Sequence, residues 1–232
     1  RRRLPAGEGV ASVGPRRHFH GMAHGIALML GLLTVLGIGP VAAGGAGTDT
    51  PQATIKTVSG QVLAALRANQ ETLRKDPAAV AAQVAKIVDP HLDFTIMSQE
   101  ALGVGWRRAD QRQRSRFTQA FHQLLTDDYA AALERYSGQT VKLMDVRWED
   151  AAHHRAIVSS QLEGPGKQPV QVDYRMYHTG GSWKVYDVVV DGVSLLLNYR
   201  QAFASELQHE DLDTLISRLV HKVATDQPSV SQ

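Results

Sequence analysis

The 232-residue chain contains no cysteine. This absence excludes a disulfide scaffold, a cysteine-ligated zinc or iron–sulfur site and a thiol nucleophile. The sequence also lacks the P-loop, Gly-x-Gly-x-x-Gly, His-Glu-x-x-His and Gly-x-Ser-x-Gly motifs. The remaining composition, 43% hydrophobic and 21% charged residues, is typical of a globular protein that is long enough to bury a substantial core. No motif therefore predicts a catalytic or metal centre.

The first 43 residues resemble an export signal. Arg16 and Arg17 precede an apolar stretch over residues 26–38, and small residues lead up to Ala43. The apolar stretch is shorter than the ~20 residues that span a bilayer, so we expect cleavage after Ala43 rather than anchoring. Removing the signal leaves 20 basic and 22 acidic residues, a net charge of about −2. The basic charge belongs largely to the signal, and nucleic acid is not a predicted partner.

The remainder is predicted to form one domain over residues 53–224, between a flexible start at 44–52 and a flexible tail at 225–232. Apolar residues spaced by three and four predict helices over residues 53–69, 77–88, 94–102, 110–136, 196–207 and 212–223. A period of two predicts strands over residues 140–148, 154–162, 169–178 and 183–190. This order predicts an α+β fold in which N- and C-terminal helices wrap a twisted antiparallel sheet of about four strands.

Two groups of polar residues suggest chemistry. Asp187 and Tyr186 lie near the end of the last strand, where a sheet-lined pocket could use them for proton transfer, although an aspartate before Gly192 is more often a turn or cap residue. A second group places five arginines within ten residues around a helix start, where cations oppose the helix dipole: Arg107, Arg108, Arg112, Arg114 and Arg116. They form either a solvated helix start or a surface for an anionic partner.

Three stretches of the chain resemble the MlaC family of periplasmic phospholipid-binding proteins, also called the toluene-tolerance auxiliary family. The first is Leu92–Met97 with Ala101–Gly103 and Trp106–Arg107. The second is Arg116–Phe121, continued by Leu124, Leu125, Tyr129 and Tyr136–Gln139. The third is Pro169–Met176, Trp183–Val188, Gly192–Leu195 and Asn198–Arg200. The resemblance extends over about residues 78–222, in the family's order.

The resemblance implies a non-enzymatic periplasmic carrier whose helices and sheet enclose an apolar cavity for the acyl chains of a glycerophospholipid, with no cofactor or metal. It also implies two partners, an inner-membrane MCE-domain protein of an ABC transporter and an outer-membrane lipoprotein complex. The residues that we expect to line the cavity are Phe94, Met97, Leu102, Phe121, Leu125, Tyr129, Val158, Val172, Tyr174, Met176, Val188 and Val190. The alternatives are an exported enzyme that uses Asp187 and Tyr186, and an interaction module without a ligand.

Overall fold

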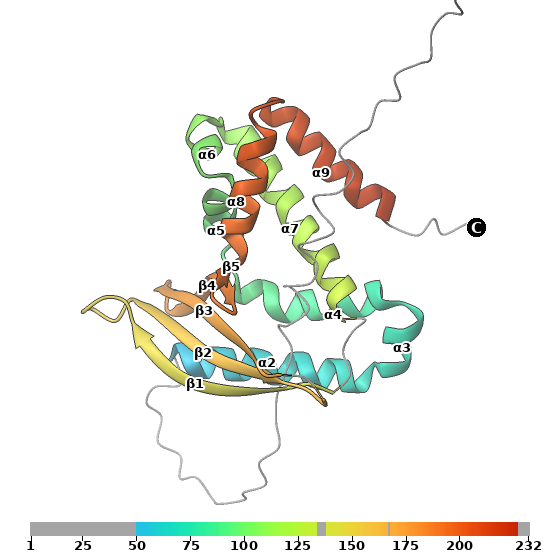
Figure 1. Ribbon diagram of the computed structural model, residues 1–232, viewed down its shortest axis with the longest axis vertical. Helices are drawn as coiled ribbons and strands as arrows, with labels where there is room; N and C mark the ends of the chain where they lie inside the picture. The colour runs from blue at the N-terminus through green and yellow to red at the C-terminus, as the bar shows by residue number, and fades with distance from the viewer. Residues whose placement is uncertain (1–49, 134–137, 167, 227–232) are drawn as a thin grey trace, which may run out of the picture.

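A computed structural model describes residues 50–133, 138–166 and 168–226 and has the predicted α+β fold (Figure 1). Helices precede and follow an antiparallel sheet, as the periodicity of the sequence predicts. The predicted export signal, residues 1–43, lies outside the described residues. Within the described ranges, no helix has both the length and the apolar character that a membrane span requires.

The sheet has five strands in the order β1-β2-β3-β4-β5, and every neighbouring pair is antiparallel. The four long strands agree with the prediction to within one residue at each end: β1 Thr140–Trp148, β2 Arg155–Glu163, β3 Val170–Thr179 and β4 Ser182–Val190. The fifth strand, β5 Val193–Ser194, was not predicted, because two residues are too short to show an alternating pattern. Gly180 and Gly181 form the predicted turn between β3 and β4, and both have positive φ.

A bulge in β4 determines which side chains reach the buried face of the sheet. Met176 pairs with Val185 and Tyr174 pairs with Val188, so β4 has one more residue than β3 between these two pairs. Val185 and Val188 consequently face the same side despite their odd spacing. All six predicted sheet residues therefore gather in one cluster: Val158, Val172, Tyr174, Met176 and Val188, with Val190 packed against them.

The N-terminal helices are α2 Pro51–Ala68, α3 Gln70–Lys75 and α4 Pro77–Val88, followed by the 3-10 turn η1 Asp89–His91. Helix α2 lies along the sheet in Figure 1, and its Ile55 belongs to the buried cluster of the sheet. The prediction of a flexible start up to residue 52 was wrong for its last two residues. Thr50 caps α2 by accepting a hydrogen bond from the Ala53 amide, and Pro51 occupies the first helical turn.

The remaining helices are α5 Phe94–Leu102, α6 Val104–Arg108, α7 Gln111–Leu133, α8 Leu195–Glu206 and α9 Leu212–Asp226. Asp110 and Gln113 form the predicted capping box at the start of α7 through two reciprocal bonds of 3.1 and 2.8 Å. The predicted end of this helix, which includes Tyr136, lies outside the described residues. Helix α9 extends into the predicted flexible tail, where residues 225 and 226 are helical.

The buried apolar side chains are divided among three clusters. The helical cluster joins α5, α7, α8 and α9, and its centre contains the rings of Phe117, Phe121, Tyr199 and Phe203. A second cluster joins α2, α3 and α4, and the third is the cluster of the sheet. Leu92, between η1 and α5, packs against both the helical cluster and the sheet cluster. The helical cluster and the sheet cluster therefore meet at this residue without merging.

Candidate functional site

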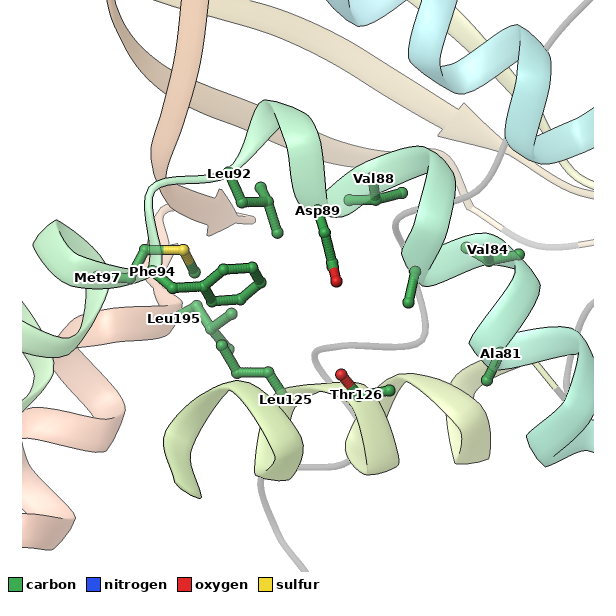
Figure 2. Close-up of a pocket in the computed structure, with 11 residues that line it drawn as sticks. Ala81, Val84, Val88, Asp89, Leu92, Phe94, Met97, Leu125, Thr126 and Leu195 are labelled. Atoms are coloured by element: carbon green, nitrogen blue, oxygen red, sulfur yellow. The ribbon is translucent and has the colours of Figure 1, made fainter. Parts of the chain in front are cut away.

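A pocket opens between the helical cluster and the cluster of α2, α3 and α4, with α4 and η1 on one side and α7 on the other (Figure 2). It contains about 550 Å³ of empty space, including the part that opens to solvent. Nine of its eleven lining residues are apolar. The full set is Ala81, Val84, Ala85, Val88, Asp89, Leu92, Phe94, Met97, Leu125, Thr126 and Leu195.

Helix α4 provides one wall of the pocket with small side chains. Ala81, Val84, Ala85 and Val88 follow one another at steps of three, one and three, which places them on one side of the helix. Asp76 caps this helix by accepting a hydrogen bond from the Ala79 amide. Short side chains leave space between α4 and α7 that leucine or phenylalanine would fill.

Asp93 fixes the position of α5, which contributes Phe94 and Met97 to the pocket. Its Oδ1 accepts a hydrogen bond from the Ile96 amide at 2.9 Å and caps the helix, and its own amide donates to the Val185 carbonyl in β4 at 3.0 Å. Its second carboxylate oxygen accepts a bond from the hydroxyl of Tyr177. Burial, this bond and the charge of Asp93 raise the pKa of Tyr177 to about 12, so the phenol stays a donor at neutral pH. The start of α5 is thereby tied to the sheet.

Asp187 fixes the start of α8, which contributes Leu195 to the pocket. Its Oδ1 accepts hydrogen bonds from the amides of Val188 and Leu196, and its Oδ2 accepts one from the Ser194 hydroxyl at 2.7 Å. Arg175 lies 3.6 Å from the same carboxylate. Burial raises the pKa of Asp187, and these donors and Arg175 partly oppose the shift. Ser194 is the N-cap of α8, and Asp187 links this residue and the first turn of α8 to β4. This is a structural role, which the sequence favoured over catalysis.

We expect Asp187→Asn to leave bound ligand unchanged and to cost no more than about one hydrogen bond, ~1 kcal/mol. The raised pKa means that the Asp187 carboxyl binds its proton more tightly in the folded protein than in the unfolded chain. The stability that the protonated carboxyl contributes is therefore lost as the pH rises from 3.8 through the folded pKa. The asparagine variant should therefore gain stability relative to wild type over this acid range. Chemical denaturation at a series of pH values measures the difference, and a relative loss with rising pH would contradict it.

The structure brings three of the predicted lining residues together in this pocket: Phe94, Met97 and Leu125 (Figure 2). Tyr129 lies in α7, and its side chain is outside the described part of the structure. Leu102 and Phe121 are buried in the helical cluster instead. The six sheet residues lie in the sheet cluster, where Ile55 of α2 packs with them, and they are not among the lining residues of this pocket.

Sequence reasoning missed the α4 wall, together with Asp89, Leu92, Thr126 and Leu195. The spacing of small residues along α4 was the available signal, because a helix face made of alanine and valine cannot fill a gap by itself. Tyr186, the other half of the alternative catalytic pair, donates a hydrogen bond to Glu149 at 3.2 Å and does not line the pocket either.

Two of the five clustered arginines have structural roles. Arg114 donates to the Trp106 carbonyl and lies over its ring, and Arg116 forms an ion pair with Asp213 at 2.5 Å. Arg107, Arg108 and Arg112 are exposed. The cluster therefore consists of a paired part, which holds α6 and α9 against α7, and a solvated part.

The fold and the pocket define a class: an α+β binding protein whose ligand site is largely apolar and lies between helices. Comparison with known proteins identifies the family. The family model described as "MlaC protein" matches residues 56–221, and the chain belongs to this family. The resemblance found in the sequence is confirmed.

Curated relatives and a solved structure agree with this assignment. The chain is 29% identical over 200 residues to the toluene tolerance protein ttg2D of Pseudomonas putida, covering 85% of this chain and 91% of the relative. It is 24% identical over 172 residues to MlaC, the intermembrane phospholipid transport system binding protein of Haemophilus influenzae, covering 73% and 80%. A phospholipid-binding protein from Ralstonia solanacearum, solved in complex with a phospholipid, superimposes with a TM-score of 0.67 at 30% identity, covering 75% of this chain and 97% of the other.

Proposed function

We propose that the protein binds one glycerophospholipid by its acyl chains and carries it between two membranes. The observation that supports this most directly is the pocket, whose buried part is entirely apolar and whose polar residues are confined to Asp89 and Thr126. The relative from Ralstonia solanacearum was solved with a phospholipid, and the Haemophilus influenzae relative is named for intermembrane phospholipid transport.

The physical need for such a carrier is large. A diacyl lipid has roughly 30 methylenes, and at ~0.8 kcal/mol each their exposure to water costs on the order of 20 kcal/mol. An apolar pocket removes much of this barrier without any chemical step. A carrier requires apolar walls and an opening, and it does not require a catalytic group.

The proposal extends to location and partners. The export signal predicted over residues 1–43 supports a periplasmic protein that is cleaved after Ala43. In the periplasm the carrier would exchange lipid with an outer-membrane lipoprotein complex and with the inner-membrane MCE-domain protein of an ABC transporter, and so maintain the lipid asymmetry of the outer membrane. Membership of the MlaC family supports these partners.

The geometry around Asp187 and Tyr186 disfavours an enzyme. Asp187 already accepts three hydrogen bonds, two of them from Ser194 and Leu196 at the start of α8, and the Tyr186 hydroxyl donates to Glu149. Neither residue faces the pocket as a lining residue. A proton-transfer reaction there would first have to break the hydrogen bonds that hold the start of α8 in place.

Mass spectrometry of the exported, purified protein tests the function and the location together. Under denaturing conditions the mass should correspond to residues 44–232. Under native conditions the mass should increase by that of one phospholipid, which lipid extraction then identifies. A protein that retains residues 1–43 would contradict the proposed processing, and a chain of the expected mass without lipid would contradict the carrier.

A further inference from the structure

A row of four aromatic rings lies at one end of the sheet, and we call it the aromatic platform. The rings belong to His153, Trp148, Trp183 and His178, in this order, and the centroids of neighbouring rings are 4.4, 5.8 and 5.3 Å apart. The turns that follow β1 and β3 lie at this same end of the sheet (Figure 1). Trp183 is 4% exposed, whereas Trp148 is 41% exposed. One large indole is therefore presented to solvent on a support of other rings.

The turn between β1 and β2 holds the exposed indole in place. The His153 amide donates to the Asp150 carbonyl at 3.2 Å, and Oδ1 of Asp150 accepts a hydrogen bond from the His154 amide at 3.0 Å. His153 has a φ of 57°, which is uncommon for a residue other than glycine. In this conformation its imidazole stacks on Trp148 with an angle of 22° between the ring planes. Trp148 is thus ordered before anything binds to it, which lowers the entropic cost of binding.

The aromatic platform is continuous with the wall of the pocket. Trp183 and Val185 both belong to the buried cluster of the sheet and are about 7 Å apart along β4. Val185 forms a bridge with Leu92, which lines the pocket, and its carbonyl accepts a hydrogen bond from the Asp93 amide at 3.0 Å. A path of contacting apolar residues therefore leads from the exposed indole to the pocket.

We propose that the aromatic platform docks on the surface of a phospholipid bilayer, with Trp148 inserted at the level of the headgroups. The proposal rests on the proposed function, because a lipid carrier collects and delivers its cargo at bilayers. An indole has an apolar body and one polar N–H group, and tryptophan is enriched where membranes meet water for this reason. The continuity with the pocket wall would place the lipid site close to the bilayer that Trp148 enters.

The charges around the aromatic platform favour the phosphate layer of a bilayer. Residues 147–155 and 178–184, which contain the four rings, include three cations and two carboxylates. The cations are Arg147, Arg155 and Lys184, and the carboxylates are Glu149 and Asp150. Arg147 and Arg155 are exposed on the strands that lead into and out of the turn. Cations beside an interfacial indole are attracted to lipid phosphates, so the excess positive charge supports the docking.

Sedimentation with sucrose-loaded vesicles of equimolar dioleoyl phosphatidylethanolamine and dioleoyl phosphatidylglycerol tests the docking. The purified protein is used with the lipid that it already carries, so that filling of the pocket does not drive its binding to vesicles. We expect the wild type to sediment with the vesicles, and Trp148→Ala to need about tenfold more lipid for half-maximal binding, the range for burying the exposed part of one indole. Melting curves restrict the comparison to folded protein.

Tryptophan fluorescence reports the same docking without a destabilising substitution. The emission of the wild type should shift to shorter wavelength when vesicles are added, because the exposed indole of Trp148 leaves water. The shift should be largely lost in Trp148→Phe, which keeps an aromatic ring at this position. A wild type that neither sediments with the vesicles nor shifts its emission would overturn the proposal.

Leu197→Ala is the matched control, because Leu197 is 48% exposed on α8 and is not part of the aromatic platform. Its binding should equal that of the wild type, and a loss as large as that of Trp148→Ala would overturn the assignment to this surface. Loss of wild-type binding in about 0.5 M salt would assign the docking to cations such as Arg107 and Arg108 instead. Binding only to vesicles that contain membrane proteins would overturn the bilayer as the partner.

Lipid extraction from the same preparations separates this proposal from the proposed function. A protein that carries phospholipid and does not bind vesicles would overturn the docking while the carrier stands. A protein that carries no phospholipid would instead overturn the proposed function. Trp148→Ala should retain the lipid content of the wild type, because Trp148 does not line the pocket.

Discussion

Leu125→Trp is expected to empty the pocket of phospholipid while the protein stays folded. Leu125 is 3% exposed and lines the pocket, where Figure 2 shows it beside Leu195 and below Phe94. The larger indole can extend into space that the acyl chains would otherwise occupy. We expect bound lipid to fall by at least about tenfold, equivalent to ~1.4 kcal/mol of affinity. Overpacking of a fully packed core typically costs ~1–3 kcal/mol of stability, and the vacant space should spare the variant most of this cost.

The adjacent residue provides the control. Leu124 is 1% exposed, belongs to the helical cluster and does not line the pocket. Leu124→Trp has the same change in size on the same helix, but it should lower the melting temperature and leave lipid per folded molecule unchanged. Both quantities are measured on one preparation of each variant. Normal lipid content in Leu125→Trp, or a loss of stability as large as that of Leu124→Trp, would show that Leu125 is an ordinary core residue.

The elements of the fold were predictable because their signals are local. Asp76, Asp93 and Asp110 each accept a hydrogen bond from an amide at the start of the predicted helix. The alternating residues of β3 lie on the buried and the exposed face as the period of two predicts. A cap or an alternation depends on neighbours within a few residues, and these are fixed by the sequence itself.

The pocket was predicted only in part because its walls are set by packing between distant segments. The apolar stripe of α7 showed that this helix packs against something large, and the same stripe could face the sheet or other helices. In the structure α7 packs mainly on α4, α5 and α9, while α2 packs against β1 and β2. Phe94, Met97 and Leu125 belong to the pocket under either arrangement. The α4 wall belongs to it only in the arrangement observed.

A void also has no local signature. A helix face of alanine and valine can pack closely against another helix or leave a gap, depending on how far apart the neighbouring elements hold the two helices. Here Asp93 ties the start of α5 to the sheet, and Asp187 ties the start of α8 to β4. These two polar anchors fix the ends of the apolar elements that surround the pocket. The space between them follows from the anchors as much as from the apolar residues.

Phe121→Ala is expected to cause the largest loss of stability without a specific loss of lipid. Phe121 is fully buried, and its ring lies 5.7 Å from that of Phe117, 5.1 Å from Tyr199 and 5.9 Å from Phe203, measured between centroids. Truncating a phenylalanine in such a cluster costs about 3–5 kcal/mol, because the rigid neighbouring rings cannot collapse into the cavity. For a domain of this size, ~2–4 °C per kcal/mol predicts a melting temperature lower by roughly 6–20 °C.

Phe121 lies one helical turn before Leu125. Substitutions at the two positions therefore compare a core residue of α7 with a pocket residue of the same helix. The alanine variant leaves every lining residue of the pocket unchanged, and the folded fraction should therefore retain wild-type lipid per molecule at a temperature below its transition. Calorimetry gives the stability, and lipid extraction after size-exclusion chromatography gives the occupancy of the folded protein. Tyr199→Phe is a milder companion, since it keeps the ring and removes the hydroxyl that donates the 2.7 Å hydrogen bond to Asp128, worth about 1 kcal/mol. If lipid declined in Phe121→Ala while the protein remained folded, the acyl chains would extend into the helical cluster, and the floor of the pocket would lie deeper than Leu125.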